Sequence, residues 1–154
     1  MIHQCGPANE ATLRGATDAM PLHLAARYLL TGYTGAELPD VLALADVVVS
    51  RSGAGTLAEL TALGKAAVFV PLPTSAGNEQ AHNAVHLQDA GAAVALTGDV
   101  TADVLREALV PLLADSARRS AMAACSREHG HPYAAQRLVD LVLDAAGLIS
   151  RPGP

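Results

Sequence analysis

The chain has 154 residues, 51% of them hydrophobic, which is enough to form a buried core without disulfide staples. A formal net charge of -5 argues against a nucleic-acid surface, and two distant cysteines, Cys5 and Cys125, indicate neither a disulfide framework nor a metal cage. No apolar run approaches the roughly 20 residues that cross a bilayer, and the N-terminus lacks a signal-peptide pattern, so we expect a cytoplasmic chain.

The N-terminal third alternates strand and helix patterns. The predicted elements are the end of a strand at residues 1–4, a helix from about Asn9 to Ala19, a strand from Arg27 to Tyr33 and a short helix from Glu37 to Ala45. Because a strand end stands at the very start, we expect the sequence to begin inside a domain and to lack the first strand of its sheet.

The stretch from Asp46 to Asn83 carries the clearest pattern. A Val-rich strand, Asp46–Ser50, is followed by a Ser/Gly loop and a helix that Gly64 closes, and a second strand, Ala67–Val70, leads into another polar loop. This order is typical of the βαβ unit of a parallel sheet. Ligands bind at the carboxyl ends of such strands, so we expect the loops Arg51–Gly55 and Thr74–Asn78 to lie side by side and form the site.

The rest of the chain continues the alternation. The predicted elements are helices at Asn78–Asp89, Thr101–Ala114, Ala117–Glu128 and Tyr133–Ala145, and a strand at Ala93–Leu96. The last helix has Leu138, Leu141, Val142 and Ala145 on one face. We predict an α/β fold with a Rossmann-like parallel sheet flanked by helices, one domain over residues 1–146 and a tail over residues 147–154.

The first loop, RSGAGT, places small residues where a strand ends and a helix begins. Its backbone N–H groups and the helix dipole favour a phosphate there. Thr56 and Glu59 also have the S/T-x-x-E spacing of a capping box, in which Glu59 would fold back onto the helix N-terminus. The sequence alone leaves both roles open for Glu59.

The same loop matches a nicotinamide-dinucleotide fingerprint, G-x-G-x-x-A, at Gly53, Gly55 and Ala58. That fingerprint requires an acidic residue about 20 residues further on, at the end of the next strand. No Asp or Glu stands between Glu59 and Glu79, so the NAD interpretation is the least favoured.

The second loop leads into Glu79, Gln80 and Asn83, which offer carboxylate and amide groups suited to the hydroxyls of a sugar. The alternative is an ordinary solvated helix start with Asn78 as its cap. His82 and His86 stand at i, i+4, but no third ligand is near them in sequence, and the chain has no D-x-D carboxylate pair. We therefore predict no metal site and no cofactor.

The motifs ADVVVSRSGAGTLAEL, VPLP, GNEQAHN and HLQDAGAAV together resemble the C-terminal, donor-binding half of the MurG-type transferases, glycosyltransferase family 28. The early His3-Gln4-x-Gly6 resembles a strand end of the same family. The resemblance runs from Ile2 to about Ala145. It implies the C-terminal half of a GT-B enzyme of peptidoglycan synthesis in the cell wall, which transfers N-acetylglucosamine from UDP-N-acetylglucosamine.

The resemblance also implies the binding residues. The segment that lines the nucleotide corresponds to Ala54, Gly55, Thr56, Leu57, Ala58 and Glu59. Glu59 would accept hydrogen bonds from the ribose hydroxyls, and the amides of the loop from Ser52 and Gly53 onward would face the diphosphate. Gln80, with Glu79 beside it, would hold the sugar hydroxyls, while Asn83 would support that loop. Thr34 corresponds to the position whose backbone reads the uracil.

The sequence departs from the family in what precedes Met1. In the family, a first strand with its GGS loop and an acceptor-binding N-terminal half would lie before Met1, so we expect this chain to lack both and assign no residue as the catalytic base. We expect turnover to need an N-terminal half or a membrane-associated partner subunit, which would hold the chain at the inner face of the membrane. An uncovered sheet edge would also allow a homo-oligomer. The alternative function is a non-catalytic nucleotide-sugar-binding or interaction module.

Overall fold

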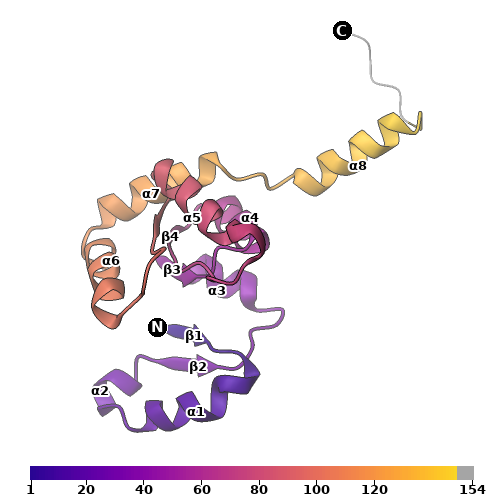
Figure 1. The fold of residues 1–154 in the computed structure, drawn as a ribbon. Coiled ribbons are helices and arrows are strands. Elements are labelled where there is room, and N and C mark those ends of the chain that lie inside the picture. The colour runs from indigo at the N-terminus through magenta and orange to yellow at the C-terminus, as the bar shows by residue number, and fades with distance from the viewer. Residues whose placement is uncertain (149–154) are drawn as a thin grey trace. The chain divides into compact units, whose positions relative to one another are not determined.

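The computed structural model describes residues 1–148, which form two compact units, Met1–Leu44 and a second that begins at Ala45. Figure 1 colours the chain from its N-terminus to its C-terminus. Both units combine parallel strands with helices, which confirms the predicted α/β class. The assignment of residues 1–146 to a single domain stays a prediction, and residues 149–154 of the predicted tail lie outside the described part of the chain.

The N-terminal unit is one βαβ unit followed by a helix. Its elements are β1 (Ile2–Gln4), α1 (Pro7–Asp18), α2 (Leu22–Ala25), β2 (Leu29–Thr31) and α3 (Leu38–Leu44). β1 pairs in parallel with β2, and His3 lies opposite Leu30. The strand predicted from Arg27 to Tyr33 is shorter than expected, because the N–H groups of Arg27 and Tyr28 bind carbonyls of Leu24 and Ala25 and close the turn after α2.

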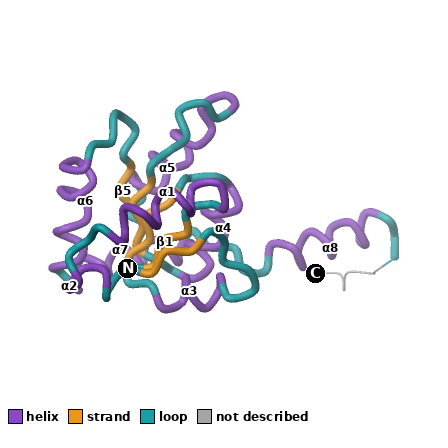
Figure 2. The backbone as a smooth tube through the Cα atoms, turned by 90° about the horizontal axis from the view of Figure 1, so that it is seen from below, coloured by secondary structure: helices purple, strands orange, loops and turns teal. Residues whose placement is uncertain are grey.

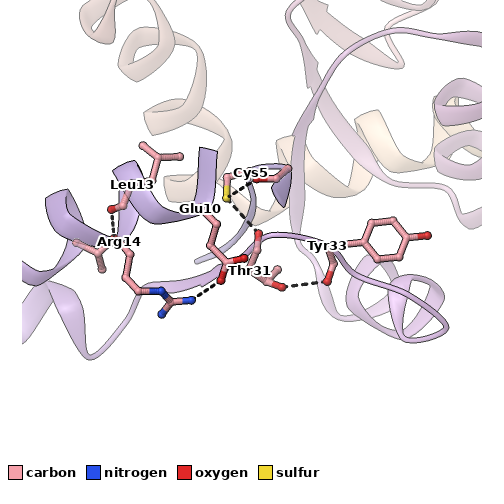
Figure 3. Close-up of polar contacts among 8 residues, drawn as sticks. Cys5, Glu10, Leu13, Arg14, Thr31 and Tyr33 are labelled. Carbon is pink, nitrogen blue, oxygen red and sulfur yellow. Dashed lines mark hydrogen bonds and ion pairs between the residues drawn. The ribbon is translucent and has the colours of Figure 1, made fainter. Parts of the chain in front are cut away.

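Polar contacts hold the turn that follows β2 (Figure 3). The Cys5 thiol donates to the Thr31 carbonyl at 3.3 Å, and the Thr31 hydroxyl donates to the Tyr33 carbonyl at 3.0 Å. The side chain of Gln4 accepts a hydrogen bond from the Thr34 N–H at 2.8 Å. The backbone around Thr34 is therefore fixed by contacts within its own unit.

The second unit contains the three-stranded part of the fold. Its elements are β3 (Val47–Ser50), α4 (Ala54–Leu63), β4 (Ala66–Phe69), the 3-10 turn η1 (Ala76–Asn78), α5 (Glu79–Asp89), β5 (Ala93–Ala95), α6 (Ala102–Ala114), α7 (Ser116–Glu128) and α8 (Ala134–Ala145). The strands run parallel in the order β3-β4-β5, with Val68 opposite both Val49 and Val94. Every strand and helix predicted for this region is present, with ends that differ by one or two residues.

The central strand β4 is buried along its whole length. Ala66 and Val68 pack against Leu112 of α6 and Met122 of α7. The successive connections β3–α4–β4 and β4–α5–β5 move across the sheet in one direction, so right-handed crossovers place α4 and α5 together on the opposite face. Figure 2 shows α5 and α6 beside β5. A parallel strand covered on both faces explains why the β4 sequence is continuously apolar.

Two close packing features shape the far end of α4. Gly64 ends this helix in a left-handed conformation, φ 60°, as the sequence predicts. Gly130, just after α7, approaches so closely that a Cβ placed on it would lie 2.6 Å from the Thr61 carbonyl oxygen.

The last described helix, α8, is amphipathic, and Leu138, Leu141 and Val142 on it are exposed. Among the helices of residues 1–148, none combines the length and the hydropathy that a membrane span requires.

Candidate functional site

The structure brings the two predicted loops together at the carboxyl ends of β3 and β4. The side chain of Ser52 is completely buried, and its hydroxyl donates to the Gln80 carbonyl at 2.7 Å. In the other direction, the Asn83 amide donates to the Ser52 carbonyl at 3.0 Å. These two bonds join residues about 30 positions apart in sequence, so the loop before α4 and the start of α5 form one surface.

The start of α4 presents unpaired backbone donors. Gly53 is the N-cap and makes no side-chain cap bond, so the N–H groups of the first turn, at Ala54, Gly55 and Thr56, have no acceptor within the helix. Ala54 and Gly55 are exposed, and a Cβ placed on Gly55 would meet no atom within 4 Å. Open donors at a helix N-terminus favour an anion.

The capping-box interpretation of Thr56 and Glu59 is wrong. α4 begins at Ala54, which makes Thr56 the third residue of the helix rather than its cap. Glu59 consequently lies in the second turn, where it is exposed. Of the other residues predicted to line the nucleotide, Leu57 is half-buried and Ala58 is exposed.

The start of α5 is also built differently from a simple cap. Asn78 is at the N-cap position, as predicted, but it adopts a left-handed conformation, φ 56°, and its side chain makes no cap bond. The Ser75 hydroxyl performs this role, since it accepts a hydrogen bond from the Gln80 N–H at 3.3 Å. Glu79 is exposed and accepts a long hydrogen bond, 3.4 Å, from the Asn83 amide.

The side-chain amide of Gln80 has a defined orientation. Its Oε1 accepts a hydrogen bond from the Leu72 N–H at 3.0 Å. Its Nε2 lies on the side of the first loop, 3.9 Å from the position of a Cβ placed on Gly53. Since Leu72 N–H can pair only with the oxygen, the nitrogen must carry its two donors toward the surface near Gly53.

Arg51 opens the first predicted loop, but the sequence suggested no role for its side chain. Its Nη1 donates to the carbonyls of Val70 and Pro71, each at 3.0 Å. A signal was available, because Pro71 and Pro73 remove N–H donors from the segment that follows β4. An arginine at the end of the adjacent strand could have been matched to the carbonyls there.

Thr34 is the one predicted site residue that lies in the N-terminal unit. Its backbone N–H is bound to Gln4 Oε1, which leaves the carbonyl as the backbone group for the N–H of a base. Its grouping with the residues of the second unit stays a prediction.

The outer face of α5 forms a separate open groove of about 500 Å³. Its lining includes His82, His86 and Asp89 of this helix and Thr97, and it meets the predicted site only at Asn78, the last residue of the second loop. The ring of His86 also meets the ring of His129 edge to face, with 5.8 Å between centroids. Within residues 1–148, no three His, Cys, Asp or Glu side chains come together as metal ligands.

Taken together, these contacts define the chemistry that the surface offers. The open N–H groups of α4 suit the negative oxygens of a phosphate. The carboxylates of Glu59 and Glu79 can only accept hydrogen bonds, and the Gln80 amide nitrogen can only donate them. A ligand with both an anionic group and several hydroxyls matches this set.

Comparisons with known proteins identify the family of the chain. The model of the glycosyltransferase family 28 C-terminal domain matches residues 1–138. A relative from Nitrobacter hamburgensis, named UDP-N-acetylglucosamine--N-acetylmuramyl-(pentapeptide) pyrophosphoryl-undecaprenol N-acetylglucosamine transferase, is 47% identical over 116 residues, which are 75% of this chain and 31% of the relative. A relative of the same name from Mycolicibacterium smegmatis is 36% identical over 147 residues, 95% of this chain and 36% of the relative.

Solved structures give the same picture. The crystal structure of MurG from Acinetobacter baumannii superposes with a TM-score of 0.78 at 31% identity, over 93% of this chain and 40% of that one. The glycosyltransferase of kitacinnamycin superposes with a TM-score of 0.62 at 26% identity, over 91% of this chain and 34% of that one. The chain thus spans about a third of the length of the curated relatives it matches.

Proposed function

Because this chain belongs to the glycosyltransferase family 28 C-terminal domain family, we propose that it binds UDP-N-acetylglucosamine as the donor for transfer of N-acetylglucosamine to a lipid-linked acceptor. One observation carries the proposal: the Ser52–Gln80 and Asn83–Ser52 hydrogen bonds hold the open start of α4 beside the start of α5, where Glu79 and Gln80 lie. The names of the relatives support this choice of donor and acceptor.

Each part of the donor has a matching group on the surface. The diphosphate binds the N–H groups at the start of α4, and the flanking residues Leu57 and Ala58 line the nucleotide. Glu59, exposed one turn further on, accepts hydrogen bonds from the ribose hydroxyls. Gln80 and Glu79 bind the hydroxyls of the sugar, and the carbonyl of Thr34 accepts the N–H of the uracil.

The requirements of the transfer reaction are met by this chain together with an N-terminal half or a partner subunit. Transfer with inversion needs a UDP leaving group whose charge is stabilised and an acceptor oxygen delivered to the opposite face of the anomeric carbon. The α4 start supplies the first requirement. The acceptor site and the base belong to an N-terminal half or a partner subunit, which also provides the contact with the membrane.

Calorimetry with three ligands tests donor binding. We expect UDP-N-acetylglucosamine and UDP to bind and NAD not to bind. Glu59→Ala should weaken both uridine ligands by about 1–3 kcal/mol, the size of a hydrogen bond to a charged group. Glu107→Ala, on the exposed face of α6, is the matched control and should leave both affinities unchanged. A binding heat with NAD, and none with UDP or UDP-N-acetylglucosamine, would reject the proposal.

A second measurement separates an enzyme part from a binding module. The chain is mixed with the N-terminal half of a MurG-type relative, and release of UDP is followed in the presence of a polyprenyl-diphosphate-linked acceptor. UDP release that requires both proteins supports the transferase. Donor binding without any UDP release would instead favour the non-catalytic module.

A further inference from the structure

The peptide unit between Pro71 and Leu72 is held from both of its ends. Its carbonyl oxygen, that of Pro71, accepts from Arg51 Nη1 at 3.0 Å, and its N–H, that of Leu72, donates to Gln80 Oε1 at 3.0 Å. The peptide is trans, so the two groups point in opposite directions from one rigid plane. Arg51 and Gln80 therefore bind the same peptide group from opposite sides.

The second bond of Arg51 fixes this plane against rotation. The same Nη1 also donates to the Val70 carbonyl at 3.0 Å, so the guanidinium ties two successive carbonyls to the end of β3. Val70 is itself anchored, because its N–H donates to the Ser50 carbonyl at 2.9 Å. With Val70 fixed, the contact to Pro71 sets the direction in which Leu72 N–H points.

That direction decides where the Gln80 nitrogen lies. A side-chain amide is planar, so once Oε1 is bound to Leu72 N–H, Nε2 can only point toward Gly53 and the start of α4. If the Pro71–Leu72 plane turned, Oε1 would lose its donor, and the amide could rotate about its last side-chain bond. Either Oε1 or Nε2 of Gln80 could then face a ligand.

From this chain of contacts we propose that Arg51 is a positioning residue, which sets the orientation of the Gln80 amide for the donor sugar without itself contacting the ligand. The inference rests on the proposed function, because it assigns the sugar to Gln80. Both hydrogen bonds of Nη1 go to backbone carbonyls of the segment after β4. The effect proposed for Arg51 therefore reaches the sugar through these carbonyls and Gln80.

The difference between two ligands provides the test. UDP lacks the sugar, so the ratio of the UDP and UDP-N-acetylglucosamine dissociation constants isolates the sugar contact. In Arg51→Met we expect UDP affinity to stay within about twofold and UDP-N-acetylglucosamine affinity to fall about 3- to 10-fold, as for the loss of one hydrogen bond. Arg106→Met, whose arginine pairs with Asp103 on the surface of α6, should change neither affinity. Equal loss of both ligands would show a direct diphosphate contact and overturn the inference.

A double variant tests whether Arg51 acts through Gln80. In a Gln80→Ala background, adding Arg51→Met should cause no further loss of sugar affinity, whereas an additive loss would overturn the inference. If Arg51→Met does not fold, Arg51→Lys serves instead, because an ammonium keeps the charge but cannot reproduce the planar contact; an unchanged ratio in that variant would overturn the inference. Failure of the proposed function gives a different result, namely that wild type binds neither uridine ligand.

Discussion

Ser52 shows how a single hydroxyl can connect two segments that are distant in sequence. Its side chain is completely buried and donates at 2.7 Å to the Gln80 carbonyl, at the point where α5 begins. The hydroxyl is therefore already used inside the protein. A ligand can reach this position only through the backbone of the loop.

Removal of this hydroxyl should lower stability measurably. We expect Ser52→Ala to reduce the free energy of unfolding by about 1–2 kcal/mol, because the Gln80 carbonyl loses its buried donor. Urea unfolding is the measurement. Ser120→Ala, at an exposed position of α7, serves as the control and should stay within about 0.5 kcal/mol of wild type. Equal stability of the two variants would mean that the Ser52 bond contributes nothing.

At the scale of the elements, the approach of the segment after α7 to α4 depends on the absence of a side chain at Gly130. A Cβ there would lie 2.6 Å from the Thr61 oxygen and 3.1 Å from the Ala62 Cα, both of which are backbone atoms. We expect Gly130→Ala to destabilise the protein by about 1–3 kcal/mol, since α4 or the segment must shift. Thermal unfolding measures this.

Gly15 provides the opposite case. It lies inside α1, where an added Cβ meets no atom within 4 Å, so Gly15→Ala should stabilise by up to about 1 kcal/mol through helix propensity. A Gly130→Ala variant as stable as wild type would contradict the close packing that the structure assigns to this segment.

The elements themselves were largely predictable from the sequence. Apolar periodicity and end signals such as Gly64 are local, and they located α4, β4 and α6 within one or two residues. The short helix α2 was missed, because four residues are too few to show a helical period. The capping box of Thr56 and Glu59 failed because α4 begins two residues before Thr56, while Asn78 is at the predicted N-cap position but its side chain makes no cap bond.

The adjacency of the two predicted loops could be read from the sequence, but the side-chain bonds around them could not. Parallel pairing of β3 and β4 was enough to bring the two loops to one edge of the sheet. By contrast, the contacts of Arg51 with Val70 and Pro71 join residues about 20 positions apart, and although the prolines mark this segment, no spacing rule identifies Arg51 as the donor to its carbonyls. A residue such as Arg51, whose contacts are distant in sequence, is therefore harder to identify from the sequence than the loops themselves.

At the scale of the whole molecule, the charges proposed to hold the donor come from backbone N–H groups and not from a carboxylate-bound ion. The sequence has no D-x-D pair of the kind that binds a divalent metal with a nucleotide sugar. We expect the calorimetric isotherm for UDP-N-acetylglucosamine to be unchanged by EDTA, since helix N–H donors remain in place without metal. Binding that disappears with EDTA and returns with Mg²⁺ or Mn²⁺ would contradict this prediction.

The glycine that begins α4 has a consequence for the empty protein. A serine or aspartate at Gly53 would stabilise the helix by only a few tenths of a kcal/mol, and its own oxygen would then occupy the first-turn amides. With glycine at this position, the first-turn amides are hydrated in the free protein. We expect the first turn to become more ordered when a ligand replaces this water. Ligand binding and ordering of the first turn of α4 are thus coupled, so that a change in one changes the other.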